Sequence, residues 1–219
     1  MHILITAGGT REYIDPVRFI TNASSGRMGY ELAKASLKAG HKVTLITTVD
    51  RKTPLTNKAN IVKVQRAAEM FEAVKNHFAN CDCLIMAAAV ADYTPVKVSK
   101  TKIKKQKSEL VIKLKPTVDI LKWAGLHKNS ELRTQNSKLK SQRRLVVGFA
   151  LEDKYLLQNA QNKLIEKKLD MIVANSIDAI DSIKSTVHIK TTVSDWQTIE
   201  NTSKSSISKK VIKLIETLF

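Results

Sequence analysis

The sequence predicts an α/β protein with a Rossmann-like, doubly wound, mostly parallel sheet, helices on both faces and an extra basic hairpin. Two observations favour this class. Short apolar runs with strand composition alternate with segments of helical spacing, and small or polar residues follow the strands, where such sheets bind ligands. Because 219 residues with 43% hydrophobic content can bury one substantial core, we expect a single domain over residues 1–219.

The first strand is expected at residues 2–6, which have the length and β-branched content of a buried strand. Small residues follow at 7–9, where the backbone must turn closely. Roughly twenty residues, rich in charged and hydrogen-bonding side chains, then precede the next helix. Hydrophobic residues among them argue for order, so we predict a loop that forms one wall of an active site.

The first predicted helix begins at Arg27, carries its apolar residues mostly on one face and ends at Gly40. Further elements expected in the first half of the chain are strands at 42–47, 61–64 and 83–87 and a helix at 67–78. A polar loop around Pro54 joins the first two of these strands. The alternation predicts parallel strands with ligands at their carboxyl ends.

The second half begins with a basic segment at 100–107, and alternation at 109–114 predicts a hairpin with an exposed strand. After Pro116 we expect a short helix capped by Thr117, then a polar loop or frayed helix at 127–144. The remaining expected elements are strands at 145–152, 169–175 and 187–193, the last of them at the sheet edge, and helices at 154–168 and 205–219.

The formal charge of +17 suggests a nucleic-acid partner, because lysine and arginine neutralise phosphates. The lysines are spread along the whole chain, however, and the aromatic content of 5% offers no platform for stacking bases. We therefore expect no nucleic-acid partner. Small polyanions such as nucleoside triphosphates would be attracted by the same field.

No apolar run approaches membrane-spanning length, and residues 2–6 are too short for a signal peptide. We therefore expect a cytoplasmic protein without a membrane partner. Its two cysteines, Cys81 and Cys83, are too close together for an ordinary disulfide and too few for a metal site, so we predict buried reduced thiols.

A nicotinamide-dependent oxidoreductase of Rossmann type is the alternative function. Asp50 follows the second strand, where a dinucleotide-binding fold places the acid that binds ribose. The glycine pattern GxGxxG between the first strand and its helix is missing, however. Tyr93 and Lys97 have the spacing of a short-chain dehydrogenase pair, but Pro95 lies between them, so we expect them not to share a helix face.

The segment TAGGTREYIDPVRFITNASSGRMG at 6–29 resembles the N-terminal signature of phosphopantothenoylcysteine synthetases, the ligases of coenzyme A biosynthesis. The resemblance returns at AAVADY (88–93), KIKK (102–105) and GFALE (148–152), and it covers residues 1 to 175 well. The chain departs from the family's usual residues at Gly9, Thr117, Val118, Lys168 and the segment 178–185.

The resemblance implies a bacterial, monofunctional ligase that joins 4'-phosphopantothenate to L-cysteine through an acyl-nucleotidylate, with Mg²⁺ and a nucleoside triphosphate. We expect CTP, because bacterial members use it and because the alanine-lined segment 88–91 leaves little room for a purine. We also expect a homodimer.

By motif position, Lys102 contacts the triphosphate, with a merely solvated basic hairpin as the alternative. Phe149 borders the base, with a simple core role as the alternative. The other expected nucleotide-binding residues are Ala88, Ala89, Asp92, Val118, Asp119, Ile120, Leu121, Lys163 and Lys167. No metal ligands are assigned.

Two roles concern the first loop. Amide formation passes through a tetrahedral oxyanion, which needs a neutral donor that cannot be acylated, and the side-chain amide of Asn22 suits this role. We assign Ser24, Ser25 and Gly26 to the phosphate of the substrate, with a helix N-cap alone as the alternative.

Overall fold

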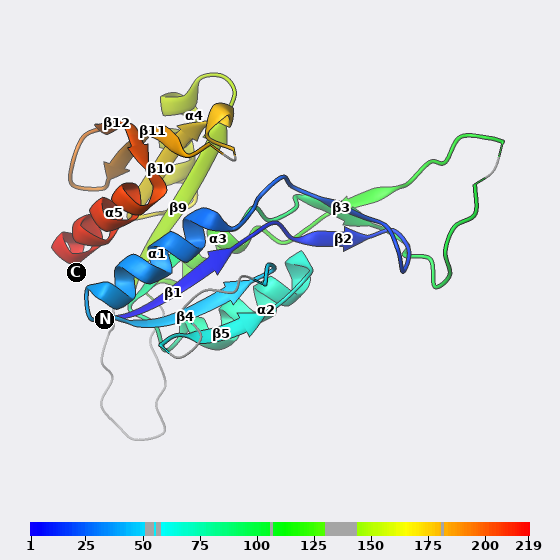
Figure 1. Ribbon diagram of the computed structural model, residues 1–219, viewed down its shortest axis with the longest axis horizontal. Coiled ribbons are helices and arrows are strands. Elements are labelled where there is room, and N and C mark those ends of the chain that lie inside the picture. The colour runs from blue at the N-terminus through cyan, green and yellow to red at the C-terminus, as the bar shows by residue number, and fades with distance from the viewer. Residues whose placement is uncertain (51–54, 56–57, 106, 130–143, 181) are drawn as a thin grey trace.

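The structure is a computed structural model that describes residues 1–219 except 51–54, 56–57, 106, 130–143 and 181. Its centre is an eight-stranded sheet with the order β12-β11-β10-β9-β6-β1-β4-β5 (Figure 1). The parallel strands are β1 (His2–Ala7), β4 (Lys42–Thr47), β5 (Asn60–Lys63), β6 (Cys83–Met86), β9 (Leu145–Glu152) and β10 (Met171–Ser176). Strands β11 (Lys184–Thr191) and β12 (Gln197–Ser203) extend the sheet antiparallel. The predicted fold class is confirmed.

Helices cover both faces of this sheet (Figure 1). They are α1 (Arg27–Lys38), α2 (Ala67–Phe78), α3 (Ile120–His127), α4 (Leu156–Glu166) and α5 (Lys204–Leu218), with a short 3₁₀ helix, η1 (Ile177–Ala179). Because side chains alternate along a strand, Ile3 and Ile5 of β1 pack in the core with α1 and α5, whereas Leu4 packs in the core with α2, α3 and α4. Strand β1 is therefore buried on both faces, as its continuous apolar sequence requires.

The sheet reverses its direction of growth beside β1. The chain adds β4 and β5 on one side of β1 and then returns to place β6 and β9 on the other side. In an open parallel sheet this reversal opens a crevice at the carboxyl ends of the strands, which is the usual place for a ligand.

The loop predicted after β1 contains a hairpin, so that prediction is incomplete. Strands β2 (Arg11–Tyr13) and β3 (Phe19–Thr21) pair antiparallel. Asp15 makes the turn between them, because its carboxylate accepts hydrogen bonds from the backbone N–H groups of Val17 and Arg18. Those bonds and the Arg18 guanidinium hold the pKa of Asp15 well below its usual range.

The predicted basic hairpin is paired only near its base. Strand β7 (Tyr93–Pro95) pairs with β8 (Leu114–Pro116), and with β2 and β3 they form an arm that projects from the sheet (Figure 1). The strand expected at 109–114 is wrong except for its last residue, Leu114. An alternating sequence forms a strand only where a neighbouring strand completes its backbone hydrogen bonds.

Two smaller expectations are also corrected. Asp119, not Thr117, caps α3, since its carboxylate accepts a hydrogen bond from Lys122 N at 2.9 Å. Strand β11 is not the sheet edge, because β12 lies outside it. The sequence of β12, QTIENTS, is too polar to predict a strand on its own. It forms a strand because it pairs with β11.

Several expectations are confirmed at residue level. Helix α2 and strand β4 have the predicted bounds, and Cys81 and Cys83 are buried free thiols. Burial raises the pKa of the Cys81 thiol to about 12, which keeps it protonated. The loop around Pro54 and most of 127–144 lie outside the described residues. In the part of the chain that the structure describes, no helix is both long and apolar enough to span a bilayer.

Candidate active site

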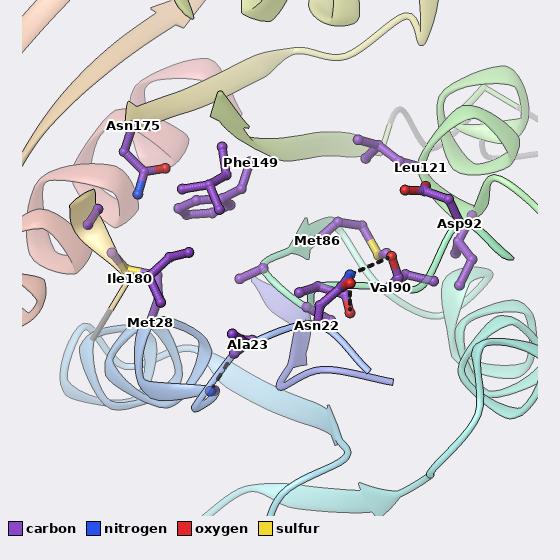
Figure 2. A pocket seen from close by; sticks show the side chains of 18 of the residues that line it. Asn22, Ala23, Met28, Met86, Val90, Asp92, Leu121, Phe149, Asn175 and Ile180 are labelled. Atoms are coloured by element: carbon purple, nitrogen blue, oxygen red, sulfur yellow. Dashed lines mark hydrogen bonds between the residues drawn. The ribbon is translucent and has the colours of Figure 1, made fainter. Parts of the chain in front are cut away.

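A cavity of about 700 Å³ opens at the carboxyl ends of β6, β9 and β10, beside the reversal of the sheet (Figure 2). This volume suits a ligand of nucleotide size. Three continuous segments line it, at 21–28, 86–90 and 117–121. The other lining residues are Asp92, Phe149, Leu151, Lys163, Lys167, Asn175, Ala179, Ile180, Ser185 and Lys204.

The amino end of α1 forms one wall. Its first helical hydrogen bond runs from Tyr30 N to Gly26 O, so the N–H groups before Tyr30 have no partner within the helix. The helix has no side-chain cap, and Gly26 has a φ of +72°. A Cβ atom at Gly26 would lie 2.7 Å from Val49 Cγ2, so glycine is required by both conformation and space. A helix end of this kind attracts anions.

Asn22 lies over the exit of β6. Its Nδ2 donates to Val90 O at 3.2 Å and more weakly to Ala89 O at 3.4 Å (Figure 2). The absence of a side chain at Gly9 permits this placement, because a Cβ atom there would lie 2.6 Å from Asn22 O. The amide therefore lies on the alanine segment that follows β6.

The segments at 88–93 and 117–121 are tied together. The Thr117 hydroxyl donates to Ala91 O at 2.6 Å, and Thr117 N donates to Asp92 O at 2.8 Å. These bonds set Asp92 beside the amino end of α3, which begins after Asp119. Both carboxylates line the cavity.

Two lysines bring positive charge to the same region. Lys163 of α4 donates to Phe149 O at 2.9 Å, and Lys167, just after α4, pairs with Asp119 at 2.8 Å. Burial lowers the pKa of Lys163, and the charge of Lys167 lowers it further. Burial works against ionisation of Asp119, but the hydrogen bonds from Lys167 and Lys122 N, together with the charges of Lys167 and Lys163, outweigh it and lower the pKa of that carboxyl.

Helix α3 fixes the position of Lys167. Gly125 lies against the end of α4, and a Cβ atom there would lie 1.8 Å from Lys167 O. Only glycine allows the two helices to approach this closely.

The far end of the cavity has a different character. Met28, Phe149 and Ile180 give it apolar walls, and the Asn175 side chain lies beside Phe149 and Ile180 (Figure 2). The sequence reasoning named Phe149 but missed Met28, Ile180 and Asn175. Asn175 could have been found, because it lies near the carboxyl end of a parallel strand.

The structure brings together every residue assigned from the sequence except Lys102. Asn22, Ser24, Ser25, Gly26, Ala88, Ala89, Asp92, Val118, Asp119, Ile120, Leu121, Phe149, Lys163 and Lys167 all line the cavity. Lys102 is an exposed residue of the arm and does not line it. Phe149 is only partly buried and packs against the core while facing the cavity, so it combines both predicted environments.

The features that suggested an oxidoreductase lie elsewhere. Asp50 pairs with Lys63 at 2.8 Å and does not line the cavity. Tyr93 lies in strand β7, so it shares no helix face with Lys97, as expected. The β2–β3 hairpin separates β1 from α1, which removes the short glycine turn of a dinucleotide site.

Among the described residues, no group of three or more histidine, cysteine or acidic side chains could hold a metal ion. The cavity does contain Asp92 and Asp119. One or two carboxylates are what Mg²⁺ requires when it arrives with a phosphate ligand, so the residues fit a metal carried by a nucleotide.

Comparisons with known proteins agree with this architecture. Residues 1–218 match the model of the family described as DNA/pantothenate metabolism flavoprotein C-terminal domain. The chain is 44% identical over 181 residues to the coenzyme A biosynthesis bifunctional protein CoaBC of Bacillus subtilis (strain 168), covering 81% of this chain and 41% of that protein. It is 46% identical over 175 residues to a cysteine/cysteine sulfinic acid decarboxylase of an unknown prokaryotic organism, covering 80% of this chain and 45% of that protein.

The chain thus spans about half the length of the curated relatives it matches. A crystal structure of the C-terminal domain of CoaBC superposes with a TM-score of 0.80 at 35% identity, covering 99% of this chain and 94% of that one. The chain is therefore similar to the C-terminal domain of the bifunctional relative.

The partly buried Lys163 generates a prediction. Lys163→Met keeps the side-chain length but removes the charge, so CTP binding should weaken about ten- to hundredfold, as expected from losing roughly 1.5–3 kcal/mol for a hydrogen bond to a charged group. The pKa of Lys163 in the folded state lies below its usual 10.5, so the unfolded state binds the proton more readily. The charged Lys163 therefore lowers the free energy of unfolding at neutral pH, and this penalty disappears as the pH rises from the folded-state pKa to 10.5. The variant should therefore be at least as stable as the parent at pH 7, with the advantage fading toward pH 10.5.

Calorimetric titration of CTP and thermal unfolding at several pH values measure both effects. Lys122→Met is the matched control, because Lys122 is exposed on α3 and does not line the cavity. Unchanged CTP binding with lower stability in Lys163→Met would contradict the assignment.

Proposed function

The chain belongs to the DNA/pantothenate metabolism flavoprotein C-terminal domain family, and from this premise we propose that it joins 4'-phosphopantothenate to L-cysteine in coenzyme A biosynthesis. One observation carries the proposal: a single cavity contains an uncapped helix end, two lysines and the Asn22 amide. An uncapped helix end and lysines bind anions, and an amide stabilises an oxyanion. The proposed reaction requires no nucleophilic side chain from the protein. The cytoplasm, where these substrates occur, is the proposed location.

In the first step, a carboxylate oxygen of 4'-phosphopantothenate attacks the α-phosphorus of CTP. The bond to the bridging oxygen breaks, pyrophosphate leaves, and an acyl-cytidylate remains. Lys163 and Lys167 neutralise the phosphate oxygens as charge moves onto the leaving group. The amino end of α1, with Ser24, Ser25 and Gly26, binds the phosphate of the other substrate.

Mg²⁺ fits as a companion of the triphosphate. Asp92 and Asp119 would hold it, and when bound it supplies further neutralisation of the phosphate charge.

In the second step, the amine of cysteine attacks the acyl carbon. The carbon–oxygen bond to cytidylate then breaks, CMP leaves, and the amine loses its proton. The tetrahedral intermediate carries a negative oxygen near the exit of β6. In the free protein the Nδ2 of Asn22 donates to Val90 O at 3.2 Å, and in this step it turns an N–H to the negative oxygen. An amide is suited to this role because it is a donor that an activated acyl group does not modify.

Lys102 has a proposed role in binding the triphosphate, which rests on its place in the KIKK motif. Since the residue lies in the arm, that role requires the arm to bring it to a cavity.

A homodimer is the proposed assembly, and the arm supports it. Large apolar side chains that are at least a third exposed gather there: Val17, Phe19, Ile20, Tyr93, Val96, Val98, Leu110, Val111 and Leu114. Exposed apolar clusters of this kind mark protein interfaces. Sedimentation velocity should show one species of twice the chain mass, and Val111→Asp should shift it toward the monomer. A parent chain that sediments as a monomer at all concentrations would end the proposal.

The nucleotide is tested by pyrophosphate release with CTP or ATP, each with 4'-phosphopantothenate, cysteine and Mg²⁺. We expect pyrophosphate release to be at least about tenfold faster with CTP than with ATP, which is the low end of the discrimination that pocket size provides. Preference for ATP would overturn the choice of base and keep the ligase. Absence of release with both would remove the proposed reaction.

The role of Asn22 is tested by separating the two steps. Asn22→Asp should still form the acyl-cytidylate and release pyrophosphate, but it should form amide about a hundredfold or more slowly, because a carboxylate repels the oxyanion that the amide stabilised. Mass spectrometry of the intermediate with and without cysteine distinguishes the steps. Loss of pyrophosphate release as well would place Asn22 in activation instead.

A further inference from the structure

Strand β11 carries an unexpected hydroxyl on its buried face. Ser185, Val187 and Ile189 alternate along that face, and the last two belong to the hydrophobic core with α1 and α5. Ser185 continues the row to the cavity, where it is 8% exposed, and its Oγ has no hydrogen-bond partner among the residues that the structure describes. A buried hydroxyl without a partner is unfavourable, so such groups in native proteins call for an explanation.

The local backbone aims this side chain. The pairing of β11 with β12 shifts register between Ser185 and Val187, and Ser185 lies opposite Thr202. Irregularities of this kind re-aim a side chain and occur often beside active sites. Ser185 therefore occupies a special position on the strand, next to the start of α5.

The lysine of α5 that lines the cavity, Lys204, is already engaged. Lys204, the first residue of α5, donates to Ser182 O at 2.7 Å and to Ala179 O at 3.2 Å. It thereby bonds to carbonyl groups close to Ile180, which lines the cavity. Lys163, Lys167 and residues 24–26 line the same cavity from α4 and the amino end of α1.

The walls around this end suit a flat ring. Phe149, Met28 and Ile180 present apolar surface, and the Asn175 side chain adds a donor and an acceptor (Figure 2). Apolar faces with a few polar groups at the edge are the chemistry that recognises a heteroaromatic base.

We infer that Ser185 is a specificity-determining residue, whose hydroxyl hydrogen-bonds the polar edge of the nucleobase at the end of the cavity formed by Phe149, Met28 and Ile180. The inference rests on the proposed use of a nucleoside triphosphate and adds a residue that reads the base. A hydroxyl bonded only to the ligand has no bond to lose in the free protein. Deleting it therefore weakens binding without lowering stability.

The test compares Ser185→Ala with Thr191→Val. Thr191 lies on the same buried row of β11, but its hydroxyl is already bonded to Ser194 Oγ at 2.7 Å and it is absent from this cavity. Each substitution removes one hydroxyl and little else. Binding of CTP, UTP, CMP and inorganic tripolyphosphate is measured by calorimetry, and the thermal midpoint by unfolding.

For Ser185→Ala we expect CTP and CMP to bind about five- to tenfold more weakly, the ratio of CTP to UTP affinity to fall toward one, and tripolyphosphate binding and the thermal midpoint to be preserved. For Thr191→Val we expect the reverse: a lower thermal midpoint and unchanged nucleotide binding. Ser185→Cys, with a weak donor, should lie between the parent and the alanine variant.

Three outcomes would overturn the inference. Unchanged CTP binding in Ser185→Ala, with a lowered midpoint, would make the hydroxyl structural. An equal loss for tripolyphosphate would place phosphate rather than base at this end. A parent chain that binds none of the nucleotides would instead remove the proposed function, and the inference would go with it.

Discussion

The site depends on how closely α1 lies against the end of β1. A Cβ atom at Gly29 would lie 2.5 Å from Ala7 Cβ and 2.9 Å from Thr6 O, so the helix can approach the strand only without a side chain there. This contact carries the amino end of α1 to the carboxyl ends of the parallel strands, where an open sheet leaves its crevice. Gly26 then permits the sharp entry into the helix. The position of the uncapped helix end in the cavity wall thus follows from a steric constraint at two glycines.

The charged groups of the cavity show the usual conflict between stability and activity. Lys163 is partly buried and its amine donates to the Phe149 carbonyl, whereas Lys167 pairs with the Asp119 carboxylate. A bound polyanion would place negative charge beside Lys163. The desolvation of Lys163 that lowers the stability of the free protein would then be offset when the ligand binds. The close approach of Gly125 to Lys167 O fixes the backbone of Lys167. Lys163 and Lys167 would therefore need little rearrangement to bind a phosphate.

Much of this architecture is visible in the sequence, and the exceptions have physical causes. Helix 67–78 was predicted at its true bounds because its apolar period is regular, and half of the cavity residues were found because motif resemblance does not depend on knowing the fold. Strand β12 was missed because its sequence is polar and only its neighbour makes it a strand. Asp119 displaced Thr117 as the helix cap because the Thr117 hydroxyl bonds to Ala91 O instead. Ser185 could have been noticed as the polar member of an apolar row, but its lack of a partner appears only in three dimensions.

One wall of the cavity joins distant parts of the chain. Met28, at the start of α1, is contacted by the Ser208 hydroxyl of α5, 180 residues later, with an Oγ–Sδ distance of 3.7 Å. Helices α1 and α5 share a core on one face of the sheet, so the apolar surface of α1 stays uncovered until the last helix docks. Closing so long a loop costs chain entropy before any contact repays it, and topologies of this kind fold slowly. A chain in which α5 has not docked leaves this part of α1 exposed, and exposed apolar surface of this kind favours aggregation.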